Sequence, residues 1–113
     1  MGRTGRRKPR PGNPSDPVGL AVAVRRFQQW MRTHAYSPST VEDRGQQIDG
    51  FIAWTEERGI TRPSEVTHAL LTRYQRHLFH YRKRDDAPLG LLTQQMRIVA
   101  VRVFFKWLAK HGM

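Results

Sequence analysis

Apolar side chains recur every three or four residues in four stretches of this sequence, and turn-forming residues separate the stretches. That spacing places the apolar side chains of each stretch on one side of an α-helix, which turns once every 3.6 residues. An alternating pattern of the kind that marks a β-strand is found nowhere along the chain. The sequence therefore predicts an all-α fold of four helices with short connections.

Capping residues predict where the helices begin and end. Asp16, Ser37, Thr67 and Thr93 each precede an apolar stretch and are good N-caps, and prolines at 17 and 38 suit the first helical position. Gly59 is placed to end the second helix. The predicted core residues are Leu20, Ala23, Val24, Phe27, Trp30 and Met31; Val41, Ile48, Phe51, Ile52 and Thr55; Leu70, Leu71, Tyr74, Leu78 and Tyr81; and Met96, Ile98, Val99, Ala100, Val101, Val103, Phe104, Phe105, Trp107 and Leu108. Because the last stretch is apolar around most of its circumference, we expect it to be the central helix.

The length of 113 residues suits one domain with one modest core. Residues 1–16 contain five basic residues and three prolines, with no large apolar side chain beyond Met1, so little there offsets the entropy of ordering. We expect a flexible basic arm over residues 1–16 and one helical domain over residues 17–113. The chain has no cysteine, which excludes disulfides and thiolate sites. With no long apolar run, it is expected to be cytoplasmic.

Positive charge is the strongest indication of function. Twenty Lys and Arg residues against nine Asp and Glu give a formal net charge of +11, with a pI near 11.4. All but four of the twenty are arginines, whose guanidinium groups pair bidentately with phosphate and with guanine edges. This composition favours nucleic-acid binding. A charged, solvated surface in an arginine-rich proteome is the alternative.

Two segments resemble a known DNA-binding domain. They are Tyr36-Ser37-Pro38-Ser39-Thr40-Val41 at the start of the second predicted helix, and Met96-Arg97-Ile98-Val99-Ala100-Val101-Arg102-Val103-Phe104-Phe105-Lys106-Trp107-Leu108 in the last one. In this order and spacing they resemble the core-binding domain of the Xer-like and phage-integrase tyrosine recombinases, over residues 18–111. The resemblance implies a SAM-like four-helix domain that forms half of a C-shaped clamp on duplex DNA. It also implies that the second and fourth helices approach the major groove, while a separate C-terminal domain cuts and joins strands.

The resemblance and the helical spacing nominate different DNA contacts. The resemblance implies Ser39, Thr40 and Arg44 on the second helix, and Gln94, Gln95, Arg97 and Arg102 on the fourth. Helical spacing instead places Gln95, Arg102, Lys106 and Lys110 on one stripe, with Arg97 about 140° around the helix from Arg102. The two arginines therefore cannot both be central to one groove contact. Arg6, Arg7 and Lys8 of the arm are further candidates.

Charge differs between the helices. The segment between Pro38 and Arg58 has five acids against two bases, so only the N-terminal turn of the second helix suits DNA. Its spacing from Ile48 places Arg44 on the buried face, from which it would have to snorkel. The third helix and its following loop have no acid before Arg84 but carry Arg73, Arg76, Arg82 and Lys83, and the fourth helix has no acid at all.

We do not expect this chain to have catalytic activity of its own. Strand exchange needs a tyrosine nucleophile, arginines on the phosphate oxygens and Lys or His for proton transfer. The resemblance places all of these in the C-terminal domain, and we interpret Tyr36, Tyr74 and Tyr81 as packing residues. His77 and His80 lack a carboxylate at ligand spacing, so phosphate contact or simple exposure is favoured over a metal, and no cofactor is predicted.

The expected partners are duplex DNA and other recombinase protomers bound to it, and the isolated domain is expected to be monomeric. Glu42, Asp49 and Glu56 recur every seven residues, which marks either a solvated face or a docking edge for a neighbouring protomer's basic helix. Two other functional classes stay open. One is a helix-turn-helix-like regulator with residues 93–110 as its recognition helix. The other is a SAM-like protein-interaction module that is basic for solubility.

Overall fold

The computed structural model describes residues 9–111. Its helices are α1 (Leu20–Thr33), α2 (Pro38–Glu56), α3 (His68–His80) and α4 (Leu91–Lys110), with a short 3-10 helix η1 (Pro63–Glu65) before α3. No β-strand occurs among the described residues; one isolated bridge joins Arg82 and Pro88 across the α3–α4 loop. The prediction of an all-α, four-helix fold is confirmed.

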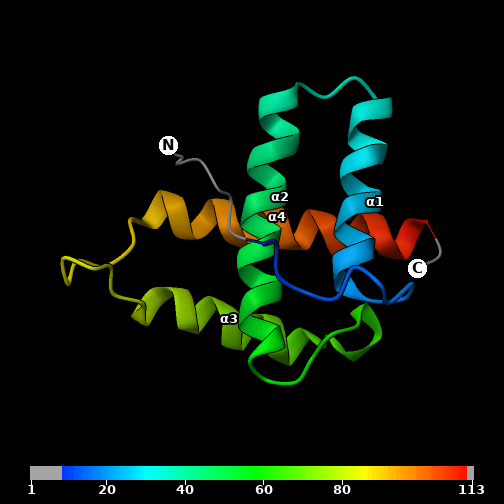
Figure 1. Cartoon of the computed structure of the whole chain (residues 1–113). Coiled ribbons are helices and arrows are strands. Elements are labelled where there is room, and N and C mark those ends of the chain that lie inside the picture. The colour runs from blue at the N-terminus through cyan, green and yellow to red at the C-terminus, as the bar shows by residue number, and fades with distance from the viewer. Residues whose placement is uncertain (1–8, 112–113) are drawn as a thin grey trace, which may run out of the picture.

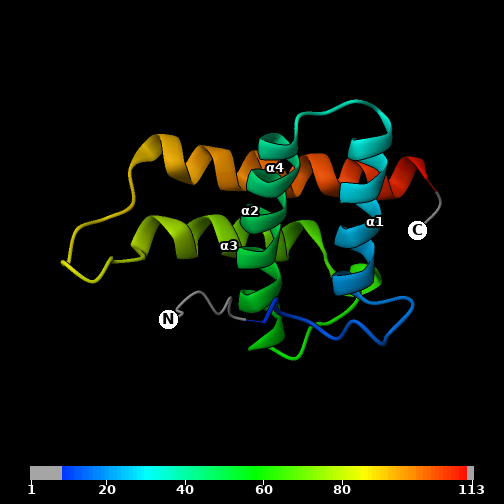
Figure 2. The same cartoon turned by 45° about the horizontal axis from the view of Figure 1, so that its top comes forward.

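The helices form two crossed layers. α1 and α2 pack against each other and run in opposite directions, and behind them α3 and α4 do the same (Figure 1). α4 passes behind both α1 and α2, so it contacts all three other helices. Figure 2 shows that the C-terminal half of α3 and the N-terminal half of α4 project together beyond α2 on one side. This projection leaves part of α4 without a covering helix.

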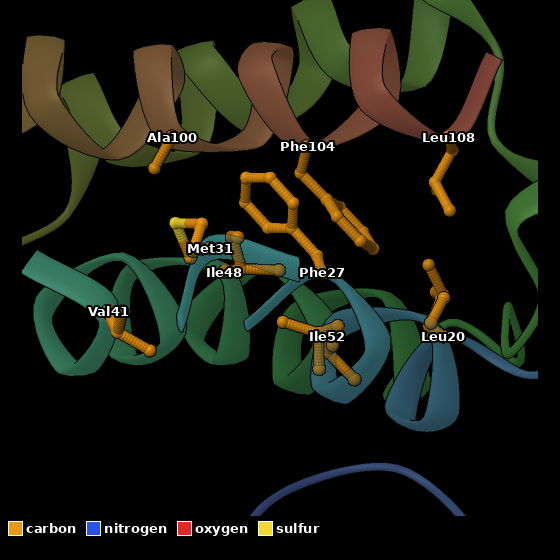
Figure 3. Close-up of a cluster of buried hydrophobic side chains, with 11 residues drawn as sticks. Leu20, Phe27, Met31, Val41, Ile48, Ile52, Ala100, Phe104 and Leu108 are labelled. Carbon is orange, nitrogen blue, oxygen red and sulfur yellow. The ribbon is translucent and has the colours of Figure 1, made fainter. Parts of the chain in front are cut away.

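Two clusters of buried side chains hold the layers together. The first joins α1, α2 and α4 around Phe27 and Phe104, with Ala100, Phe104 and Leu108 of α4 pointing toward α1 and α2 (Figure 3). The second joins α2, α3 and α4 around Phe51 and Tyr74. α4 contributes to both clusters and packs against each of the other three helices, so the expectation that it is the central helix is confirmed.

Three predicted core residues lie at the surface instead. Met96 and Val99 are 48% and 49% exposed, and Tyr81 is 43% exposed. Met96 and Val99 line an open groove between α4 and α2, so no neighbouring helix buries them. α3 ends at His80, so the extended backbone at Tyr81 carries its ring off the helical stripe.

The helix starts were predicted correctly in two of four cases. The Ser37 and Thr67 side chains accept hydrogen bonds from the backbone N–H groups of Thr40 and Leu70, as N-caps should. α1, however, begins at Leu20 after Gly19, and α4 begins at Leu91 after Gly90, so Asp16 and Thr93 are not caps. Asp16 accepts from the Val18 N–H in a turn and pairs with Arg62 at 3.0 Å.

The second half of the predicted arm lies against the helices. Arg10 pairs with Asp49 of α2 at 2.8 Å. Gly12 has φ +87°, and a Cβ there would be 2.8 Å from the Ala21 Cβ, so only glycine fits at this point. Residues 9–16 therefore differ from the expected free arm, while residues 1–8 lie outside the described residues.

Candidate nucleic-acid interface

The solvent-facing side of α4 has a mixed basic and apolar surface. Gln95, Arg102 and Lys106 are exposed and lie on the side of the helix that faces away from Ala100 and Phe104. Leu92 and Val99 share this side and are 70% and 49% exposed. The structure thus places the predicted stripe on an open surface. α4 contains no acidic residue, so this surface suits a polyanion.

A groove of about 260 Å³ separates the projecting part of α4 from α2. Arg44 and Gln47 line it from α2, and Leu92, Gln95, Met96, Val99 and Ala100 line it from α4. No acidic side chain lines it. Its walls combine a guanidinium, two amides and several apolar groups, which are the side-chain types that contact base edges in a DNA major groove.

Arg44 reaches the surface from a partly buried position. Its guanidinium carbon lies 6.0 Å from the ring centroid of Tyr36, and its side chain lines the groove. This is the snorkelling arrangement that the sequence requires of an arginine next to the core. Gln47 was not nominated from the sequence. Its position three residues after Arg44, one turn along the same helix face, is the signal that identifies it.

The candidates at the start of α2 lie outside the groove lining. Ser37 Oγ donates to Thr40 Oγ1 at 2.8 Å and lies 3.3 Å from Ser39 Oγ. These hydroxyls therefore form a hydrogen-bonded cap at the first turn of α2. Ser39 is exposed and Thr40 is half-buried.

Arg97 and Arg102 lie on different sides of α4. Arg102 is exposed, whereas Arg97 is half-buried and close enough to Tyr74 and His77 of α3 to influence both electrostatically. Gln94 also turns inward, and its amide donates to the Leu89 carbonyl at 3.0 Å. The groove with α2 therefore includes Gln95 and excludes Gln94 and Arg97. Arg6, Arg7 and Lys8 lie outside the described residues.

Comparison with known proteins supports the resemblance found in the two sequence segments. The chain is 44% identical over 100 residues to tyrosine recombinase XerC 2 of Ralstonia nicotianae, a match that covers 86% of this chain. The chain is related to the Xer-like tyrosine recombinases. It spans 29% of that relative's length. No family model matches the chain, and no solved structure matches it.

The three tyrosines of the chain differ in exposure. Tyr74 is buried against Phe51 and Trp54, and burial raises the pKa of its hydroxyl to about 12, so it is a poor nucleophile at neutral pH. Tyr36 and Tyr81 are 38% and 43% exposed. Tyr36 packs near Trp30, with ring centroids 6.1 Å apart. Packing accounts for Tyr36 and Tyr74, while Tyr81 lies at the edge of the loop after α3.

No group of three His, Cys, Asp or Glu residues in the described part of the chain is arranged to hold a metal ion. None of the described helices has the length and apolarity needed to span a membrane.

The acidic stripe on α2 lies beside cations of the same chain. Asp49 pairs with Arg10, and Glu42 and Asp49 line a polar pocket of about 530 Å³ with Arg10 and Arg32. A docking role for this stripe stays a prediction, and a partner helix there would compete with Arg10 for Asp49.

Proposed function

We propose that this domain binds duplex DNA as the core-binding part of a tyrosine recombinase. It would hold the target half-site while a separate domain cuts and joins the strands. The observation that carries the proposal is the open, acid-free surface of α4, continuous with the α2–α4 groove. The relationship to a tyrosine recombinase supports it independently.

In this proposal the groove side chains, together with Arg102 on the exposed side of α4, contact base edges. Arg102 and Arg44 offer guanidinium groups suited to guanine, and Gln47 and Gln95 offer amides suited to adenine. Met96 and the other exposed apolar residues would contact thymine methyl groups. This assignment accounts for apolar side chains on a helix face that no other helix covers.

Lys106 and the basic residues at positions 6, 7 and 8 would contact phosphates, which position a protein on DNA without reading its sequence. Further protomers on the same DNA are the other expected partners, and the isolated domain would be monomeric. Salt-dependent duplex binding separates this function from that of a protein-interaction module, because counterion release is specific to polyanion binding.

Alanine substitutions on α4 test the proposal. Binding to duplexes selected from a randomised pool should weaken by about 1–3 kcal/mol, with relaxed sequence preference, in Arg102→Ala. Lys106→Ala should weaken binding equally for all sequences. Arg32→Ala on α1 is the matched control, since Arg32 is also an exposed helical arginine.

The outcome for Arg97 decides which side of α4 faces the DNA. If Arg102→Ala and Lys106→Ala bind like the parent while Arg97→Ala does not, the side toward α3 is the reader. If no substitution on α4 affects binding, the assignment of α4 as the reading element is wrong.

A further inference from the structure

A second basic surface lies on α3, apart from the α2–α4 groove. Arg73, Arg76, His77 and His80 occupy positions i, i+3, i+4 and i+7 of this helix, so they share one face. α3 contains no acidic residue. Arg73, Arg76 and His80 are exposed, and His77 is half-buried.

Arg58, just beyond the end of α2, faces this stripe across a shallow pocket of about 230 Å³. Its guanidinium carbon lies 4.1 Å from the ring centroid of Trp54, and its Nη1 donates to the Trp54 carbonyl at 2.9 Å. Trp54 is itself only 4% exposed, so it is a rigid support. These contacts hold Arg58 in place before any ligand arrives, which lowers the entropy cost of binding.

Like charges dominate this pocket. Neither Arg73 nor Arg76 takes part in an ion pair in the part of the chain that the structure describes. The pKa of His77 lies below its ordinary value, chiefly because of burial and then because of Arg58, with Arg97 adding to the effect and Glu57 opposing it. Gathering these cations destabilises the folded chain, and a bound anion would offset that cost.

We propose that Arg58, Arg73, Arg76, His77 and His80, together called the α3 cluster, bind backbone phosphates of duplex DNA. This inference rests on the proposed DNA-binding function and adds a second contact surface to it. Three arginines, at positions 58, 73 and 76, line the shallow pocket beside two histidines and Trp54, which suits phosphate oxygens, since arginine pairs bidentately with them. It contains no amide side chain of the kind that reads adenine edges.

The arrangement of the helices allows one duplex to meet both surfaces. α3 and α4 pack against each other and project beyond α2 on the same side (Figures 1 and 2). DNA bound at the α2–α4 groove would therefore pass close to the α3 cluster. Contacts of this kind fix the register of a protein on DNA without contributing to sequence choice.

A double substitution, Arg73→Gln with Arg76→Gln, tests the proposal. The control is Arg26→Gln with Arg32→Gln, which removes two charges from exposed positions on α1. Affinity would be measured on two duplexes of unrelated sequence. The NaCl concentration would range from about 50 to about 300 mM, because binding through phosphate contacts depends strongly on salt in this range. The α3 variant should lower the log–log salt slope by about 1.8, or ~0.9 per phosphate contact, and weaken binding to both duplexes by the same factor. The control should keep the parental slope.

Equal slopes for the α3 and control variants would overturn the proposal. If Arg102→Ala still weakens binding in that case, the proposed function stands without the α3 cluster. If the parent binds no duplex at any salt concentration, the proposed function itself fails.

Titration with inorganic pyrophosphate separates the two sources of phosphate. Shifts of the His77 and His80 ring signals on adding DNA, matched by a change in salt slope, support the proposal. Shifts with pyrophosphate and an unchanged slope on DNA would identify a site for free phosphates and overturn the DNA contact.

Discussion

Truncation of Phe104 should destabilise the domain more than any change at the proposed DNA surface. The Phe104 ring is fully buried between α1 and α4, with its centroid 5.7 Å from that of Phe27 and 5.1 Å from that of Phe105. Removing a buried phenylalanine ring costs about 3–5 kcal/mol, and the loss of two aromatic contacts favours the upper part of that range. Since ~1 kcal/mol shifts Tm by roughly 4–8 °C in a domain of this size, we expect Phe104→Ala to lower Tm by on the order of 20 °C.

This effect can be measured by thermal unfolding, with the loss of helix monitored by circular dichroism at about 222 nm. Val99→Ala is the matched control, because Val99 is on the same helix but 49% exposed, and we expect a change within ~0.5 kcal/mol. Phe105 is half-buried, so Phe105→Ala should fall between the two. A Phe104→Ala protein that melts within a few degrees of Val99→Ala would refute the packing described for α4.

Four further predictions concern two glycines, His77 and the absence of strand cleavage. Gly45→Ala should lower the free energy of unfolding by about 1–2 kcal/mol, because a Cβ there overlaps the buried Gln28 amide that donates to the Val41 carbonyl. Gly50→Ala, whose Cβ would lie 3.6 Å from its nearest neighbour, should instead raise it by ~0.5–1 kcal/mol in urea titrations. His77 has a lowered pKa in the folded state, so its contribution to stability should be present above its ordinary value of 6.5 and be lost as the pH falls through the folded pKa. Replacing His77 with Gln should flatten this pH dependence, and an unchanged profile would contradict the shift. The chain should form no covalent adduct with a nicked suicide duplex, and an adduct on a denaturing gel would contradict the assignment of catalysis to a separate domain.

Local chemistry made much of the fold predictable. The recurrence of Leu20, Phe27 and Met31 identified the buried face of α1, and Ser37 and Thr67 identified two helix starts, because each depends on residues within one or two turns. The prediction that Asp16 is the N-cap of the first helix was wrong, and the local sequence does not show why. Its carboxylate pairs with Arg62, 46 residues away, and the backbone of Gly19 begins α1 instead.

The candidate interface was predicted in part from the sequence and in part only from the tertiary structure. Helical spacing determined that Arg97 and Arg102 lie on different sides of α4, and composition determined that the surface is basic. Only the tertiary structure decided that Arg102 faces solvent and Arg97 faces α3, because that depends on where α2 and α3 cross α4. It also decided that apolar Met96 is exposed in the α2–α4 groove, since periodicity describes one helix and not how closely its neighbours approach it.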